Sequence, residues 1–297
     1  MEIMSANLNR TLLVSDMDGT LLNSKHAISK ENIEAIKRFV AQGGLFTLAT
    51  GRIDSSVRPY LENLPVNAPA ILYNGAMIYD CKRHHIIWEQ FLPDDAKRIV
   101  WPILDEFPET GIEVYDAAGD VHILADNGLI HYHMLRESLQ PKRLGVEFPL
   151  KTLAWRKILF AWDQKYMPLL QRFLNRLIRQ QGWSIRTMRT EANFLEIVPR
   201  DVNKGVALAQ VSKSLGVERS NVIAIGDNLN DLEMLQMAGV GVAVANAHRS
   251  VKRVATFCTV SNDDHAVSEV VKWIEGHRKG NCQWTKVKSD IQDIGVI

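Results

Sequence analysis

Short apolar runs alternate with amphipathic helical patterns in the first third of the chain. Residues 11–15 form a continuous apolar run typical of a strand that is buried on both faces. Ser29 can cap the helix that follows, and Gly43-Gly44 ends it. Further runs predict strands at 45–49 and 70–73, with a helix at 55–61 between them. This βαβαβ order predicts a parallel, doubly wound sheet with right-handed crossovers.

The same rhythm returns in the last third of the chain. Asn203 can cap a helix that runs to Leu215. Strands and helices then alternate again, the strands predicted at 221–225, 241–245 and 257–260, and the helices at 231–237, 248–254 and 265–274. Both thirds therefore contribute to one α/β core.

Between the two parts the alternation of strands and helices is lost. β-type runs at 112–115, 121–124, 157–162 and 183–186 mix with helical patterns at 94–107 and 166–179. Two strands without a helix between them imply antiparallel pairing. The fold class that this predicts is α/β, a Rossmann-like doubly wound parallel core with an inserted α+β domain. We expect the core to comprise 1–84 and 194–297, and the insertion 85–193.

Two acidic groups follow predicted core strands directly. Asp16-Met17-Asp18-Gly19-Thr20 leaves the first strand, and Asp227 and Asp231 lie four residues apart after the strand at 221–225. Open parallel sheets bind ligands beyond the carboxyl ends of their strands. A solvated acidic turn or a helix cap explains one such group, but the cap explanation would have to apply twice. The pattern therefore favours a hard cation, or a carboxylate nucleophile beside an acid/base.

Cationic and hydrogen-bonding residues complement these carboxylates. Thr50-Gly51-Arg52 ends the second strand, where a hydroxyl and backbone N–H groups could hold phosphate oxygens. Lys204, at the start of a helix, is a compact charge able to neutralise a phosphate. Asn74, after the third strand, could add an amide donor, although Asn-Gly usually marks a turn. Alone, each would be an ordinary surface or turn residue.

Composition narrows the classes of function. The 35 basic and 34 acidic residues give a net charge of +1, which argues against nucleic-acid binding through bulk electrostatics. No apolar run could span a membrane, residues 1–15 lack the pattern of a secretory signal, and three scattered cysteines do not form a disulfide framework. We therefore expect a cytoplasmic protein without nucleic-acid or membrane partners.

The motifs together resemble the haloacid dehalogenase superfamily of aspartate-nucleophile phosphatases, and most closely its Cof-type branch. The resemblance covers nearly residues 10–275 and rests on the four signatures above, with Tyr73–Ala76, Asn203–Gly205 and Val244–Ala247 adding to it. In this branch the insertion is a cap domain. The chain departs from the family where His265 replaces a common glycine, and in the tail beyond Gly276.

The resemblance implies a role for each matching residue. Asp16 would be the nucleophile and Asp18 the general acid/base, with Thr50 and Lys204 binding the transferring phosphoryl group. Mg²⁺ would be held by Asp16, the backbone carbonyl of Asp18, and Asp227, with Asp231 orienting or ligating through water. Gly51, Arg52 and Asn74 are the expected substrate-binding residues of the core.

The expected substrate is a small phosphorylated metabolite, first a sugar phosphate and next a cofactor-related phosphate, handled by a monomer or weak homodimer. A phosphomutase that passes the phosphoryl group to a second sugar hydroxyl is the alternative enzyme. A phospho-receiver switch is a non-enzymatic alternative, which the paired aspartates on one strand and the long insertion disfavour. His131 and His133 are interpreted as surface residues, and Glu191 and Asn193 as possible substrate contacts.

Overall fold

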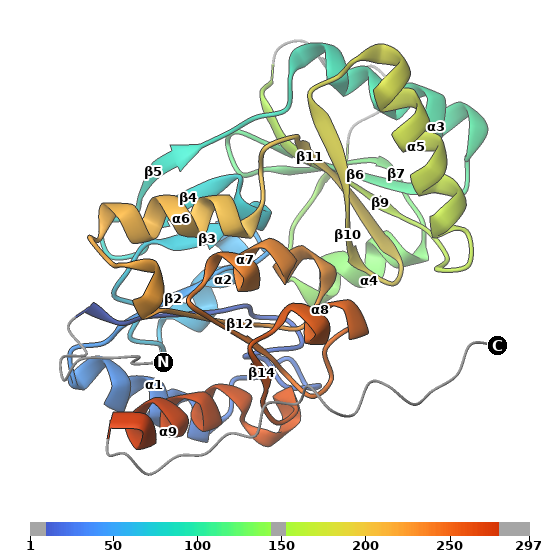
Figure 1. Ribbon diagram of the computed structural model, residues 1–297. Coiled ribbons are helices and arrows are strands. Elements are labelled where there is room, and N and C mark those ends of the chain that lie inside the picture. The colour runs from blue at the N-terminus through green and yellow to red at the C-terminus, as the bar shows by residue number, and fades with distance from the viewer. Residues whose placement is uncertain (1–9, 144–152, 279–297) are drawn as a thin grey trace.

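The computed structural model describes residues 10–143 and 153–278. Figure 1 shows an α/β core built from both ends of the chain, with a second body formed by the middle of the chain lying over one side of it. Among the described helices, none combines the length and the apolar character that crossing a membrane requires.

The core sheet is parallel throughout, in the order β14-β13-β12-β1-β2. Its strands are β1 (Leu12–Ser15), β2 (Leu45–Leu48), β12 (Val222–Gly226), β13 (Val240–Ala243) and β14 (Phe257–Cys258). β3 (Ala70–Leu72) continues the sheet beside β2 through a parallel bridge between Ala49 and Ile71. The predicted parallel, doubly wound core is confirmed.

Helices cover both faces of this sheet. α1 (Lys30–Ala41) packs with α9 (Ala266–Arg278) on one face, and α6 (Lys204–Ser214) packs with α7 (Leu232–Met237) on the other (Figure 1). The shorter helices α2 (Asp54–Leu61) and α8 (Arg249–Val254) follow β2 and β13. Ser29 caps α1 as expected, because its hydroxyl accepts a hydrogen bond from the Asn32 amide at 3.2 Å.

The strand order positions a binding crevice. β1 lies between β2 and β12, so the chain leaves β1 toward one edge of the sheet and leaves β12 toward the other. The loops after these two neighbouring strands therefore diverge. Such a switch point opens a crevice at the carboxyl ends of the strands. The two acidic motifs come directly after β1 and β12, so both border this crevice.

The inserted domain contains a six-stranded sheet in the order β10-β11-β9-β6-β7-β8, antiparallel except for β7–β8. Its strands are β6 (Gly111–Asp116), β7 (Val121–Ala125), β8 (Lys142–Arg143), β9 (Trp155–Ala161), β10 (Ile185–Glu191) and β11 (Phe194–Pro199). One face packs on α3 (Val100–Glu106) and α5 (Met167–Gln181), and α4 (Gly128–Arg136) lies on the side toward the core (Figure 1). The expected α+β insertion is confirmed as a fold class.

The strand pairing places the boundaries between core and cap at other residues than the sequence predicts, which are 85 and 193. β5 (His85–Glu89) pairs with β4 (Met77–Asp80), which in turn pairs with β3 beside the core. β11, placed with the core from the sequence, lies within the cap sheet between β10 and β9. The reason is that hydrogen-bonding partners far apart in sequence set these boundaries. By backbone pairing the cap begins after Gln90, which bonds Ala76, and extends to Pro199.

Alternation along the cap strands separates apolar from charged side chains. Ile112, Ile158 and Leu195 belong to the apolar cluster formed with α3 and α5. Because successive side chains of a strand point to opposite faces, their neighbours Glu113, Lys157 and Glu196 point the other way, toward the core. The cap therefore presents a charged face to the crevice.

Candidate active site

Asp16 lies at the end of β1, where its backbone N–H donates to the Ile225 carbonyl of β12 at 2.9 Å. The residue is 5% exposed. Gly19 turns the chain with a φ of +75°, and a Cβ at this position would lie 2.6 Å from a carboxylate oxygen of Asp227. The glycine of the motif is therefore required both by the backbone conformation and by the approach of the second acidic loop.

Lys204 joins the two acidic motifs. Its Nζ donates to Oδ1 of Asp16 at 2.6 Å and to Oδ1 of Asp231 at 2.6 Å, and the side chain is fully buried. Asn203 caps the helix that carries Lys204, since its side chain accepts a bond from the Val206 amide. Burial lowers the pKa of Lys204, but the two carboxylates raise it by more, so the ammonium stays charged.

Asp227 and Asp231 lie on the loop after β12. Asp227 accepts a hydrogen bond from the Thr20 hydroxyl at 2.9 Å. The other oxygen of Asp231, Oδ2, accepts the backbone N–H groups of Asp227 at 2.9 Å and Asn228 at 3.0 Å. Both oxygens of Asp231 therefore hold Lys204 and the loop, whereas Asp227 accepts the Thr20 hydroxyl.

The carboxylates of Asp16 and Asp227, with Asp231 close to both, could hold a divalent cation. One oxygen from each of the three residues lies within 4.8 Å of the other two. Burial and the charge of Asp231 raise the pKa of Asp227 to about 7, and the same two causes raise the pKa of Asp16 above its usual range. One ammonium does not balance this cluster, and carboxylate oxygens are the ligands that Mg²⁺ prefers.

Thr50-Gly51-Arg52 enters the crevice from the end of β2. Thr50 and Arg52 are 1% and 2% exposed, and both line the cavity described below. The Arg52 guanidinium donates from Nε to Oδ2 of Asp18 and from Nη2 to Oδ1, each at 2.7 Å. Arg52 was expected to contact substrate, and in this structure it holds both oxygens of Asp18 in a fork.

Asn74 contacts two residues that line the cavity, Glu196 and Asn230. It is fully buried at a φ of +57°, and its amide nitrogen donates to Oε2 of Glu196 at 2.7 Å. Its oxygen accepts from Asn230 at 2.9 Å. Asn74 is not among the described residues that line the cavity, so its contacts here join the core to the cap.

A cavity of about 270 Å³ lies between the core motifs and the charged face of the cap. Its core side includes Asp16, Asp18, Thr50 and Asp227. Its cap side comprises residues from α4 and its C-cap and from three strands: His133, Arg136, Glu137, Lys157, Leu159, Thr190, Glu191, Phe194 and Glu196. Of the two residues suggested near the end of the insertion, Glu191 lines the cavity and Asn193 is not among its described lining residues.

Most of these cap residues are not predicted from the sequence. His133 was interpreted as a surface residue, but it is 2% exposed and faces Glu113. A signal was present, because charged residues interrupt otherwise apolar strands at Glu113, Lys157 and Glu196. A charge in a buried strand usually has a partner or a function.

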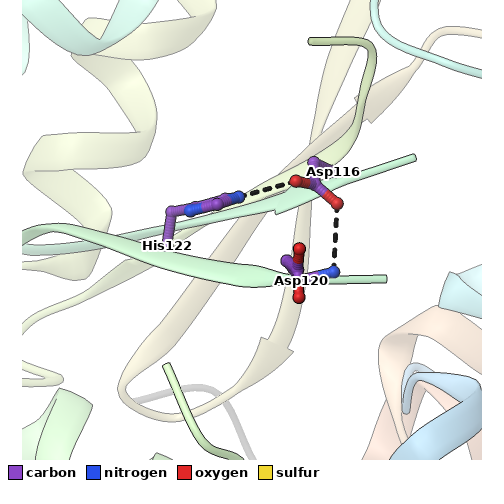
Figure 2. A group of neighbouring side chains, drawn as sticks. All are labelled: Asp116, Asp120 and His122. Atoms are coloured by element: carbon purple, nitrogen blue, oxygen red, sulfur yellow. Dashed lines mark hydrogen bonds and ion pairs between the residues drawn. The ribbon is translucent and has the colours of Figure 1, made fainter. Parts of the chain in front are cut away.

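A second group with metal-ligand chemistry lies at the β6–β7 hairpin of the cap. Figure 2 shows His122 directed at Asp116, with Nε2 of His122 2.7 Å from Oδ2 of Asp116. The Asp120 backbone N–H donates to the other oxygen of the same carboxylate. Asp120 pairs with Lys142 at 2.5 Å. The carboxylates thus serve the turn and an ammonium, and we assign the group to the structure of the hairpin.

Comparison with known proteins agrees with this geometry. The model of the haloacid dehalogenase-like hydrolases matches residues 13–271. A protein of Bacillus subtilis named 5-amino-6-(5-phospho-D-ribitylamino)uracil phosphatase is 30% identical, over 85% of this chain and 94% of its own. Another B. subtilis protein, named a phosphatase, is 28% identical, over 88% of this chain and 98% of its own.

A solved structure gives the same result in three dimensions. The crystal structure of a haloacid dehalogenase-like hydrolase from Bacteroides thetaiotaomicron is 31% identical, with a TM-score of 0.78, over 89% of this chain and 99% of that one. The expected enzyme class, a phosphoric monoester hydrolase, is confirmed. The chain therefore belongs to the haloacid dehalogenase-like hydrolase family.

Proposed function

We propose that the protein is a Mg²⁺-dependent phosphatase that hydrolyses a small phosphomonoester through an aspartyl-phosphate at Asp16. The observation that carries this proposal is the placement of Lys204 Nζ 2.6 Å from both Asp16 and Asp231, with Asp227 beside them. A carboxylate can approach an anionic phosphate only when nearby cations offset the repulsion. A buried ammonium and a cation site beside the nucleophile meet that need.

Each core residue has a distinct role in this proposal. Asp16 attacks phosphorus while Asp18 protonates the leaving alcohol, and Asp18 then deprotonates the water that cleaves the aspartyl-phosphate. Thr50 and Lys204 hold phosphoryl oxygens. Asp16, Asp227 and the Asp18 carbonyl would hold Mg²⁺, which when bound supplies Lewis-acid polarisation of the phosphoryl group.

The substrate we propose is a sugar phosphate or a cofactor-related phosphate. The cavity of about 270 Å³ suits a small molecule, and the cap over it disfavours phosphates of macromolecules. The B. subtilis relative is named for a substrate that carries a phosphorylated ribityl chain, which falls within this class.

An Asp16→Asn variant tests the proposed function. The amide cannot attack phosphorus, so release of inorganic phosphate from p-nitrophenyl phosphate with Mg²⁺ should fall to the background of a protein-free sample. Mass spectrometry of the acid-quenched wild type should find the phosphoryl group on Asp16. Asp105→Asn, at an exposed residue of α3, is the matched control and should keep wild-type activity. Substantial turnover by a folded Asp16→Asn protein would rule out this nucleophile.

A further inference from the structure

The cations on the cap side of the cavity are already paired with carboxylates. Arg136 donates to both oxygens of Glu191 at 2.8 and 2.5 Å. Lys157 donates to Glu196 at 2.8 Å and to the Gly51 carbonyl at 3.1 Å. These side chains therefore offer little unpaired positive charge to an anionic group on the leaving alcohol.

His133, the third cation of this wall, is held between two carboxylates. Its Nδ1 lies 3.0 Å from Glu113, and its Nε2 lies 3.2 Å from Glu137. Tyr115 donates to Glu113 at 2.5 Å. Burial lowers the pKa of His133, but the charges of Glu137 and Glu113 raise it to about 10. Both ring nitrogens thus carry protons directed at carboxylates.

Glu137 is the carboxylate of this group that faces the cavity. It follows the last turn of α4, is 8% exposed, and lines the cavity wall. Oε1 contacts His133, whereas Oε2 has no hydrogen-bond donor among the described residues. Burial raises the pKa of Glu137, but the charges of His133, Arg52 and Lys157 lower it by more, so it remains ionised.

Carboxylates match every cation on the cap side of the cavity. Among its lining residues, Glu137, Glu191 and Glu196 face His133, Arg136 and Lys157. Glu113, which is fully buried and does not line the cavity, takes the second ring nitrogen of His133. A buried carboxylate with a free oxygen attracts hydroxyl or ammonium donors and repels anions. This end of the cavity differs from the phosphoryl end, where Lys204 and the cation site lie.

We propose that Glu137 determines leaving-group specificity: it accepts a hydrogen bond from a hydroxyl of the alcohol and excludes alcohols that carry a second anionic group. The inference rests on the proposed function and refines its substrate class to monophosphates of neutral or cationic polyhydroxy compounds. Bisphosphates and phosphorylated acids are rejected because no unpaired cation at the cap end compensates their second charge.

A matched pair of substrates tests this proposal. Wild type and Glu137→Gln would be assayed with fructose 6-phosphate and fructose 1,6-bisphosphate at saturating Mg²⁺, following inorganic phosphate. Wild type should prefer the monophosphate, and Glu137→Gln should lower that preference in kcat/KM by about 10- to 100-fold, the range of a hydrogen bond to a charged group. The lower kcat/KM of Glu137→Gln on fructose 6-phosphate should come from a higher KM. Glu106→Gln, an exposed residue of the same domain, should leave the preference unchanged.

A second variant separates the effect of the charge at position 137 from the effect of the side-chain length. Glu137→Asp keeps the charge but withdraws the oxygens by one methylene, so it should raise KM for fructose 6-phosphate and still reject the bisphosphate. It also provides the test if Glu137→Gln does not fold, as judged by circular dichroism. Equal use of both substrates by wild type, or an unchanged preference in folded Glu137→Gln, overturns the inference alone. No phosphate release by wild type from either sugar or from p-nitrophenyl phosphate overturns the proposed function and the inference together.

Discussion

At the scale of single residues, the Arg52 guanidinium forms a fork with Asp18, the proposed general acid/base, and both side chains line the cavity. Arg52 is 2% exposed, and its Nε and Nη2 both donate to Asp18. Its Nη1 donates to Ser56 at 3.0 Å. Both oxygens of Asp18 are thereby fixed relative to the cavity. We therefore propose that Arg52 positions Asp18 in addition to lining the cavity.

Arg52→Lys should impair proton transfer more than phosphoryl transfer. Lysine keeps the charge but cannot form a planar fork, so Asp18 loses its fixed orientation. General acid catalysis contributes about 10² to 10⁴ in rate, and we expect about a 10-fold or larger loss of kcat on an alkyl phosphate. The loss on p-nitrophenyl phosphate, whose leaving group needs little protonation, should be smaller.

The matched control is Arg58→Lys, because the Arg58 side chain is 67% exposed. It should leave both rates at the wild-type level. Equal losses on the two substrates in Arg52→Lys would mean that Arg52 serves phosphate binding or folding, and not the orientation of Asp18.

At the scale of elements, two cap strands bind core loops through buried polar side chains. Lys157 of β9 contacts Glu196 of β11 and the Gly51 carbonyl, and Glu196 contacts Asn74. Lys157 and Glu196 side chains are each 4% exposed. The network joins the cap sheet to the loop after β2, which carries Thr50 and Gly51, and to the loop after β3, which carries Asn74.

Removing one charge from this network should destabilise the protein. Lys157→Met leaves the Glu196 carboxylate buried with one partner fewer, at a cost of about 3–5 kcal/mol in the free energy of unfolding. Lys157→Met combined with Glu196→Gln should recover part of that loss, because no uncompensated charge remains. Urea unfolding of the single and double variants measures the coupling.

Lys37→Met, at an exposed position of α1, is the control and should change stability little. Strictly additive effects of Lys157→Met and Glu196→Gln would show that the two side chains do not depend on each other for stability.

At the scale of the whole molecule, we expect ionisation of the acidic cluster to make stability depend on pH and on Mg²⁺. The folded pKa of Asp227 is raised from 3.8 to about 7. Between these values the folded protein binds a proton that the unfolded chain has released. Stability contributed by this group is therefore present at low pH and is lost as pH rises from about 4 toward 7 and above.

Mg²⁺ should reverse this loss, because the cation replaces the proton on the carboxylates. In thermal unfolding with and without EDTA, the stabilisation by Mg²⁺ should be larger at pH 8 than at pH 5.5. At a Mg²⁺ concentration 100 times its dissociation constant, binding adds about 2.7 kcal/mol. Asp227→Asn should remove most of the Mg²⁺ effect, and an equal Mg²⁺ effect at both pH values would contradict the linkage.

The core site could be predicted from sequence because its geometry follows from local order. Asp16, Thr50 and Asp227 each follow a strand of one parallel sheet, and the carboxyl ends of parallel strands meet at one edge. Apolar runs and capping residues identify those strands and helices, and the resemblance to the family assigned the roles. The meeting of Lys204 with Asp16, 188 residues apart, then follows from the predicted fold.

Tertiary structure alone decided the cap wall and its boundaries. Glu113, Lys157 and Glu196 share one face because β6, β9 and β11 are neighbours, and alternation within a strand does not say which strand lies beside it. The same holds for β5 and β11, which join sheets across the predicted division. Local periodicity is set by neighbouring residues, whereas pairing between distant strands depends on the packing of the whole chain.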